Sequence, residues 1–200
     1  MRNETKSPIR LNTTLTREKL KDLRAGDQIL LSGTDYTARD AAHKRIVEML
    51  DRGEETPFPI EGSVIYYVGP TPAKPGNPIG SAGPTTSYRM DAYAPRLMGE
   101  GQLMMIGKGQ RSDEVKKAVR ECGAVYVAAV GGAAAVMARQ VRSSEIIAFA
   151  DLGAEAVRRL EVEDLPVTVV LDPEGGDLYE SGPAEYLSER SDPAPAPTAG

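Results

Sequence analysis

The chain has 200 residues, of which 40% are hydrophobic and 26% are charged, and its formal net charge is −5 at pH 7. This length and composition are typical of one globular domain with a sizeable core. The net negative charge argues against a nucleic-acid-binding protein, because such proteins normally carry a basic surface. The single cysteine, Cys122, excludes an internal disulfide framework and any cysteine-based metal site built from this chain alone.

The N-terminal stretch "MRNETKSPIR" lacks the apolar core of a secretion signal, and no apolar run approaches the length of a membrane span. We therefore expect a cytoplasmic protein that contacts neither membrane nor nucleic acid.

Hydrophobic periodicity and turn residues predict alternating strands and helices. The predicted strands are residues 8–15, 28–33, 63–69, 102–107, 124–130 and 165–172. The predicted helices are residues 16–23, 38–50, 112–122 and 133–141, with a further short helix after residue 86. Thr16 and Ser112 are suited to helix N-caps, and Gly123 is suited to end a helix.

This alternation predicts a mixed α/β domain over residues 9–182. The strands lack strict alternation of apolar and polar residues, which indicates that both of their faces are covered. A loose N-terminus (residues 1–8) precedes the domain, and a disordered tail rich in proline and alanine (residues 183–200) follows it.

The stretch "GPTPAKPGNPIGSAGPTT", residues 69–86, holds five prolines and four glycines with almost no apolar residues between them. Structureless segments of this length inside a compact domain are uncommon, and they are usually functional or disordered. The alternative is a solvated excursion from the fold. We refer to residues 69–86 as the Pro/Gly loop.

The stretch "TARDAAHKR", residues 37–45, predicts the start of a helix. Thr37 and Asp40 fit a capping box in which aspartate replaces the usual glutamate, and this places Arg39 in the first turn. The free N–H groups of a helix start attract anions, whereas a cation there is mildly unfavourable. A bound carboxylate would offset that cost; the alternative is a solvated Arg39 with no role.

His43, the one histidine of the chain, lies four residues after Arg39 and therefore on the same helix face. Val47 and Leu50 share this face, which predicts that it turns inward. His43 is either a histidine at the edge of the core with one hydrogen-bond partner or part of a site at a strand-to-helix crossing, where α/β proteins often bind ligands.

Two further segments combine cations with flexible or hydroxyl-bearing residues. In "GPTTSYRM", Thr85 or Thr86 can cap the following helix, and Arg89 lies within its first turn. In "GKG", Lys108 stands between two glycines, so it can present its ammonium group to an anion. This is not a phosphate-binding loop, because the stretch before Lys108 lacks the first glycine of the Walker pattern.

Arg39, Arg89 and Lys108 each follow or flank a predicted strand-to-helix crossing. Such a set suits a small dianion with two carboxylates, because arginine binds carboxylates in a bidentate way. Thr85 and His43 are the nearby groups that could transfer protons.

The segments "SGTDYTARDAAHKR", "YYVGPTPAKPG", "GPTTSYRMD" and "MIGKG", in this order, resemble the β region of iron–sulfur-dependent hydro-lyases. These are the class I fumarate hydratases and the L(+)-tartrate dehydratases. The resemblance runs from about residue 8 to residue 179 and includes "VEDLPVTVVLDPEGGDLYE". It implies a swivelling β/β/α domain similar to the mobile domain of aconitase.

The resemblance also implies roles and partners. Thr85 matches the residue proposed as catalytic base, and His43 matches an active-site histidine of the tartrate enzymes. Contacts to the substrate carboxylates and hydroxyl are implied for Arg39, Thr86, Arg89 and Lys108. The family's [4Fe-4S] cluster is held by three cysteines of an α region, which here would be a separate α subunit because this chain has one cysteine. An α2β2-type assembly is expected.

Three functions follow as hypotheses. The first is the β subunit of a two-subunit fumarate hydratase, which hydrates fumarate reversibly to L-malate. The second is the β subunit of an L(+)-tartrate dehydratase, which makes oxaloacetate. The third is a non-catalytic module that binds dicarboxylates.

Overall fold

The computed structural model describes residues 7–129 and 134–183. Its strands are β1 (Ile9–Asn12), β2 (Gln28–Thr37), β3 (Val64–Tyr66), β4 (Met104–Gly107), β5 (Val125–Ala129), β6 (Val141–Ala148) and β7 (Val157–Leu171). Its α-helices are α1 (Arg17–Leu20), α2 (Asp40–Asp51), α3 (Ala94–Gly99), α4 (Asp113–Cys122) and α5 (Ala134–Arg139). Two 3₁₀ helices are η1 (Ser87–Met90) and η2 (Ala150–Glu155). The predicted mixed α/β class is confirmed.

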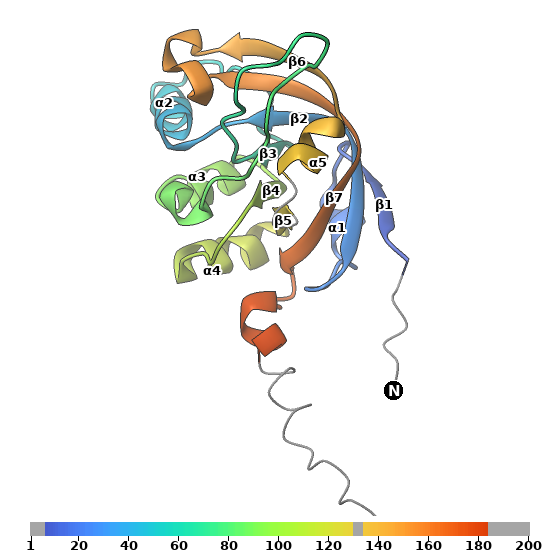
Figure 1. The fold of residues 1–200 in the computed structure, drawn as a ribbon. Helices are drawn as coiled ribbons and strands as arrows, with labels where there is room; N and C mark the ends of the chain where they lie inside the picture. Colours follow the sequence, from blue (N-terminus) through green and yellow to red (C-terminus); the bar gives the residue numbers. More distant parts are fainter. Residues whose placement is uncertain (1–6, 130–133, 184–200) are drawn as a thin grey trace, which may run out of the picture.

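The described strands form one seven-stranded sheet in the order β1-β2-β3-β4-β5-β7-β6. Neighbours from β1 to β5 pair in parallel, and β7 pairs antiparallel with β5, β6 and β2. Strand β7 also pairs with β2. The strand pairings therefore form a closed ring, in the order β2, β3, β4, β5, β7 and back to β2. The strongly curved sheet of Figure 1 is the result.

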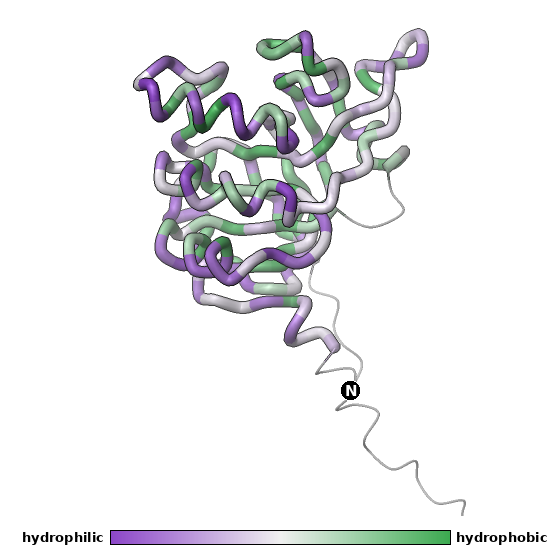
Figure 2. The backbone as a smooth tube through the Cα atoms, turned by 90° about the vertical axis from the view of Figure 1, so that its left-hand side faces the viewer, coloured by the Kyte–Doolittle hydropathy of each residue, from purple (hydrophilic) through white to green (hydrophobic). Residues whose placement is uncertain are grey.

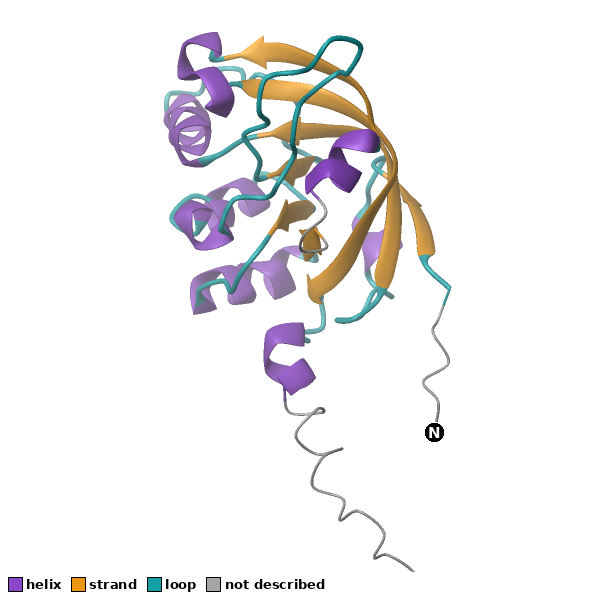
Figure 3. Ribbon diagram, viewed as in Figure 1, coloured by secondary structure: helices purple, strands orange, loops and turns teal. Residues whose placement is uncertain are grey.

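Apolar side chains fill both faces of the central strands, as the lack of alternation predicts. All residues of β3 and β4 are buried. One core cluster lies inside the ring and includes Leu31, Tyr66 and Val169. The second lies between the strands and helices α2, α3 and α4, which stack along one side of the sheet (Figure 3). Hydrophobic residues accordingly concentrate in the strands, and hydrophilic ones in the outer helices and loops (Figure 2).

Most of the predicted helix boundaries agree with the structure. Thr16 caps α1 and accepts a hydrogen bond from the Lys19 amide, and Ser112 caps α4 in the same way. Gly123 ends α4 in the left-handed conformation, which costs glycine little. The prediction for Thr37 is wrong: it is the last residue of β2, and Arg39 occupies the N-cap position of α2.

The sequence reading missed β6 and the first half of β7. Strand β6 is largely exposed at the sheet edge and therefore carries polar residues, which hid its periodicity. Strand β7 runs through Pro166, a residue that usually interrupts a strand. Pro166 lies between the residues paired with β6, which end at Val162, and those paired with β5, which begin at Val167. On its other side Pro166 pairs with Leu30 of β2. The missing N–H of Pro166 therefore costs no ladder hydrogen bond with β5 or β6.

The first half of the Pro/Gly loop projects from the domain, and its second half packs against the core. Residues 71–78 are exposed, whereas Ile79 and Ala82 are buried in the cluster inside the ring. The Tyr66 hydroxyl donates to the carbonyl of Ala82 from within the core.

Every helix in the described part of the chain is too short or too polar to cross a membrane. Apart from residues 7, 8 and 183, the predicted loose N-terminus and disordered tail lie outside the described residues. The similarity to the mobile domain of aconitase stays a prediction.

Candidate anion-binding site

The predicted site residues gather at the carboxyl ends of three neighbouring parallel strands. Arg39 follows β2, and Lys108 directly follows β4. Thr85 lies against the residue after β3, because its amide donates to the Tyr67 carbonyl at 2.7 Å. The carboxyl edge of a parallel sheet is where α/β proteins bind ligands. We call Arg39, Arg89, Lys108, Thr85 and Thr86 the clamp.

Arg39 is held at the N-terminus of α2 by a carboxylate from η2. Its Nη2 lies 3.2 Å from Oε1 of Glu155, whose Oε2 accepts a hydrogen bond from the Ala41 amide at the helix start. Glu155 thus supplies one carboxylate at this helix end, and the bound carboxylate predicted there stays a prediction. A side chain at Gly69 would place its Cβ 3.0 Å from Arg39 Nη1, so glycine there leaves room for the guanidinium.

Asp40 joins the two arginines of the clamp. Its Oδ2 accepts a hydrogen bond from Arg89 Nη2 at 2.7 Å, and its Oδ1 lies 3.9 Å from Arg39 Nε. The Arg39 side chain is 20% exposed and the Arg89 side chain 41% exposed. Both arginine side chains are therefore partly exposed, although Arg39 Nε is buried.

Thr86 and Lys108 lie side by side in an isolated parallel bridge. The Ser87 amide donates to the Lys108 carbonyl at 2.9 Å, and the Lys108 amide donates to Ser87 Oγ at 3.0 Å. This close approach requires glycine at position 107, where a Cβ would lie 1.9 Å from Ser87 Oγ. Two segments about twenty residues apart in sequence are thereby fixed together.

The clamp leaves several polar groups available. Within residues 7–129 and 134–183, the hydroxyls of Thr85 and Thr86 make no hydrogen bond, and the exposed Lys108 ammonium has no ion-pair partner. Thr86 takes the N-cap position of η1, but its side chain makes no capping bond. These groups can therefore bind a ligand without breaking contacts in the described chain.

His43 lies beneath the clamp and faces inward, as predicted. It is completely buried, and its Nδ1 donates to the Arg39 carbonyl at 2.9 Å, which leaves Nε2 as an acceptor without a partner in the described residues. Its ring meets the Tyr67 ring edge-on, with centroids 5.2 Å apart. Burial lowers the pKa of His43 from 6.5 to about 4, so the imidazole is neutral at physiological pH.

The sequence analysis missed two residues that build this site, Glu155 and Ser87, and the buried ion pair of Asp91 and Arg111 close to it. Glu155 gave no signal, because it lies 114 residues from the helix start that it caps. The sequence shows Arg111, the arginine of "GKGQRS", as a cation close to Lys108. It gives no sign that the Arg111 side chain is buried.

The described residues contain no group of three or more histidine, cysteine, aspartate or glutamate side chains that could hold a metal ion. Cys122 ends α4, ten residues beyond the N-cap residue Ser112 and therefore at the end of the helix far from Lys108. Burial raises the pKa of its thiol, which disfavours the thiolate that binds metals. This chain therefore does not fit an iron–sulfur cluster as its sole ligand source.

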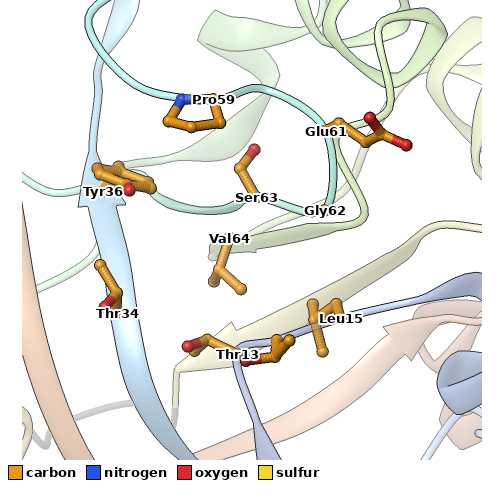
Figure 4. Close-up of a pocket in the computed structure, with 10 residues that line it drawn as sticks. Thr13, Leu15, Thr34, Tyr36, Pro59, Glu61, Gly62, Ser63 and Val64 are labelled. Carbon is orange, nitrogen blue, oxygen red and sulfur yellow. The ribbon is translucent and has the colours of Figure 1, made fainter.

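A separate pocket of about 250 Å³ opens at the amino end of β3 (Figure 4). Among its lining residues are Thr13, Thr34, Glu61 and Ser63. No cation lines it, so it does not suit an anionic ligand, unlike the opposite edge of the sheet.

Comparison with known proteins identifies the family. Residues 1–182 match the family described as "Fumarase C-terminus". "Fumarate hydratase 2" of Leishmania major is 40% identical over 165 residues, which cover 82% of this chain and 29% of that protein. "Fumarate hydratase class I, anaerobic" of Escherichia coli (strain K12) is 40% identical over 155 residues, covering 76% of this chain and 28% of that protein.

A third relative has nearly the same length. The "Putative L(+)-tartrate dehydratase subunit beta" of Methanocaldococcus jannaschii is 40% identical over 172 residues, covering 83% of this chain and 88% of that protein. The chain thus spans less than a third of the two fumarate hydratases but most of the β subunit. It belongs to the family of class I fumarate hydratases and L(+)-tartrate dehydratase β subunits, and it corresponds to the part called the fumarase C-terminus.

Proposed function

We propose that this chain is the β subunit of a two-subunit hydro-lyase that reversibly hydrates fumarate to L-malate. The observation that carries the proposal is the meeting of two arginines, a lysine and two free threonine hydroxyls at the carboxyl ends of β2, β3 and β4. Three cations around one edge suit a substrate with two carboxylates.

In this proposal the clamp binds and orients the dicarboxylate. Arg39 and Arg89 each present a planar fork that matches a carboxylate, and Lys108 adds a point charge. Removing the proton beside a carboxylate places extra negative charge on that carboxylate. The same cations then stabilise the charge as it develops, which accelerates the reaction.

Thr85 is the proposed proton-transfer residue, and Thr86 binds the substrate beside it. A threonine hydroxyl is a weak base, and the surrounding cations favour its deprotonated form. His43 is less suited to this role, because it is buried and its pKa of about 4 leaves it a poor base at neutral pH. Its bond to the Arg39 carbonyl gives it a positioning role instead.

The partner in this proposal is an α subunit with three cysteines that hold a [4Fe-4S] cluster, in an α2β2-type assembly located in the cytoplasm. The cluster would supply a Lewis acid for the hydroxyl that leaves or adds. The single cysteine of this chain and its place at the far end of α4 support a cluster held by the partner.

A second candidate is the β subunit of an L(+)-tartrate dehydratase, which forms oxaloacetate. The relative of nearly equal length, of which this chain covers 88%, supports it. Both reactions use the same dicarboxylate clamp and differ at the second hydroxyl of the substrate.

The test is anaerobic co-expression with the three-cysteine partner, followed by measurement of fumarate absorbance with malate, fumarate and L-tartrate. We expect turnover of malate and fumarate, and a loss in kcat/KM of about 100-fold or more in Arg89→Ala. The matched control is Arg45→Ala, which removes an exposed arginine of α2 that pairs with Asp151 outside the clamp. Preference for tartrate would support the second candidate.

No turnover of any dicarboxylate by a cluster-loaded complex would overturn both enzymatic proposals. Calorimetric titration of the chain with succinate, a dicarboxylate that cannot react, then decides the remaining case. Binding that Arg89→Ala abolishes would leave a non-catalytic dicarboxylate module.

A further inference from the structure

A buried arginine lies directly below the clamp. The Arg111 side chain is fully buried, and its Nε donates to Asp91 Oδ1 at 2.7 Å. The other carboxylate oxygen of Asp91 accepts a hydrogen bond from the Ser112 amide at 2.7 Å. Asp91 immediately follows η1, and Ser112 is the N-cap of α4. One ion pair thus joins the segment that carries Thr85, Thr86 and Arg89 to the end of the Lys108 loop, residues 107–111.

Two tyrosine rings flank this guanidinium. Its Cζ lies 4.8 Å from the centroid of the Tyr126 ring and 5.4 Å from that of Tyr67. Such cation–π contacts help to offset the cost of burying the charge. Burial by itself would lower the pKa of Arg111, but Tyr67 and Asp91 hold it above the usual value, so the group stays charged.

The Tyr126 hydroxyl extends this cluster to the Lys108 loop. It donates to the Gly109 carbonyl at 2.9 Å and lies 3.0 Å from Ser87 Oγ. The same Ser87 Oγ accepts a hydrogen bond from the Lys108 amide. Hydrogen bonds therefore link Tyr126 and Ser87 to the backbone of both Lys108 and Gly109. Burial raises the pKa of Tyr126, which keeps its hydroxyl protonated and able to donate.

We propose that Arg111 and Tyr126 are positioning residues: together they fix the Lys108 loop against the segment of Thr85 and Arg89, and so set the spacing between the lysine and the threonine of the clamp. This inference rests on the proposed function for its catalytic consequence. The geometric part depends only on this chain. A buried ion pair adds little net stability, and a role in fixing one conformation is its best-attested use.

The primary test is Tyr126→Phe in the full chain, which keeps the ring over Arg111 and removes the hydroxyl. By hydrogen exchange measured with NMR, we expect the Lys108 amide to exchange at least tenfold faster. In the complex with the three-cysteine partner, we expect kcat to fall about tenfold while KM changes less than threefold. Arg111→Lys keeps the charge but loses the planar contacts with the rings, so it should show the same pattern.

Tyr36→Phe is the matched control: its ring stacks on Phe58 rather than on Arg111, and its hydroxyl makes no hydrogen bond in the described residues. It should leave exchange at Lys108 and kcat within twofold of the wild type. Leu20→Ala, which removes a fully buried side chain of α1 in the other core cluster, controls for a general loss of stability.

Unchanged exchange at Lys108 and unchanged kcat in Tyr126→Phe would overturn the inference. Equal changes in Tyr126→Phe and Leu20→Ala would overturn it as well, because stability alone would then explain them. An inactive wild-type complex would overturn the proposed function instead. The exchange measurement needs no turnover and would still decide the positioning role.

Discussion

The Asp40 carboxylate accepts a hydrogen bond from the Arg89 guanidinium at 2.7 Å, across 49 residues of sequence. Its second oxygen lies 3.9 Å from Arg39. Glu155 pairs with Arg39 from the other side. The free clamp therefore already holds two carboxylates, which a substrate must share or displace. In the proposed function, we expect this internal competition to limit the affinity of the clamp for a dicarboxylate.

Asp40→Asn should strengthen dicarboxylate binding. Removing the internal carboxylate leaves Arg89 without its charged partner, so we expect the Kd for succinate to fall about three- to tenfold at low salt. Calorimetric titration checks this, and the difference should shrink in high salt because ions screen exposed charges. The control is Asp51→Asn at the far end of α2, which should change nothing. Weaker binding in Asp40→Asn would mean that Asp40 orients the arginines rather than competing for them.

Thr85→Ala should lower kcat about 100-fold or more, since it removes the proposed proton-transfer hydroxyl. Thr85→Ser keeps a hydroxyl and should recover most of the rate, whereas Thr86→Ala should mainly raise KM. Steady-state kinetics of the complex with its three-cysteine partner measures all three. A slow Thr85→Ser variant together with a normal Thr85→Ala variant would exclude the hydroxyl as the reacting group.

His43 should make the folded chain sensitive to mild acid. Its pKa is about 4 when folded and 6.5 when unfolded, so the unfolded state binds a proton first as the pH falls through this window. Above pH 6.5 His43 therefore does not lower the free energy of unfolding. Between pH 6.5 and pH 4 its protonation in the unfolded state lowers that free energy by up to about 3 kcal/mol. Urea unfolding at a series of pH values measures this loss. His43→Gln should abolish this part of the pH dependence, and an unchanged profile in that variant would contradict it.

Asp35 should make the folded chain less stable as the pH rises, whereas His43 makes it less stable as the pH falls. It is fully buried in β2, and neither of its carboxylate oxygens has a hydrogen-bond partner in the described residues. Burial raises the pKa of Asp35 well above 3.8, so stability is lost as the pH rises from 3.8 through the folded pKa. Asp35→Asn should raise the free energy of unfolding at pH 7 by about 1–3 kcal/mol. Below pH 3.8 the two proteins should be equally stable, and a constant difference at all pH values would refute the assignment.

Gly107→Ala should separate the two segments that carry Thr86 and Lys108. The added Cβ would lie 1.9 Å from Ser87 Oγ, so the segments must move apart. We expect a loss of about 1–3 kcal/mol in stability and a larger loss of succinate affinity than stability alone explains. Ser87→Ala in the same chain removes the clashing oxygen and should restore part of both. If Gly107→Ala binds succinate normally, this close approach does not matter for the clamp.

Much of the fold was predictable, because local patterns specify it. The caps Thr16 and Ser112 and the stop at Gly123 depend on backbone groups within a few residues. The buried strands β3, β4 and β5 have continuous apolar sequences that burial on both faces requires. Strand β6 was not predicted, because edge strands keep polar side chains. The cap of α2 was not predicted, because Glu155, a residue far away in sequence, supplies it.

The sequence by itself determined which residues could bind a dianion: Arg39, Arg89 and Lys108 each follow or flank a predicted strand-to-helix crossing, and glycine or threonine stands near them. Only the tertiary structure decided how they act together. It brought Glu155 to the start of α2, placed Asp40 between two arginines and buried Arg111 below Lys108. It also made the one histidine a neutral core group. The physical reason is that residue type fixes charge and hydrogen-bonding capacity, whereas burial and long-range pairing decide which of these groups stay free for a ligand.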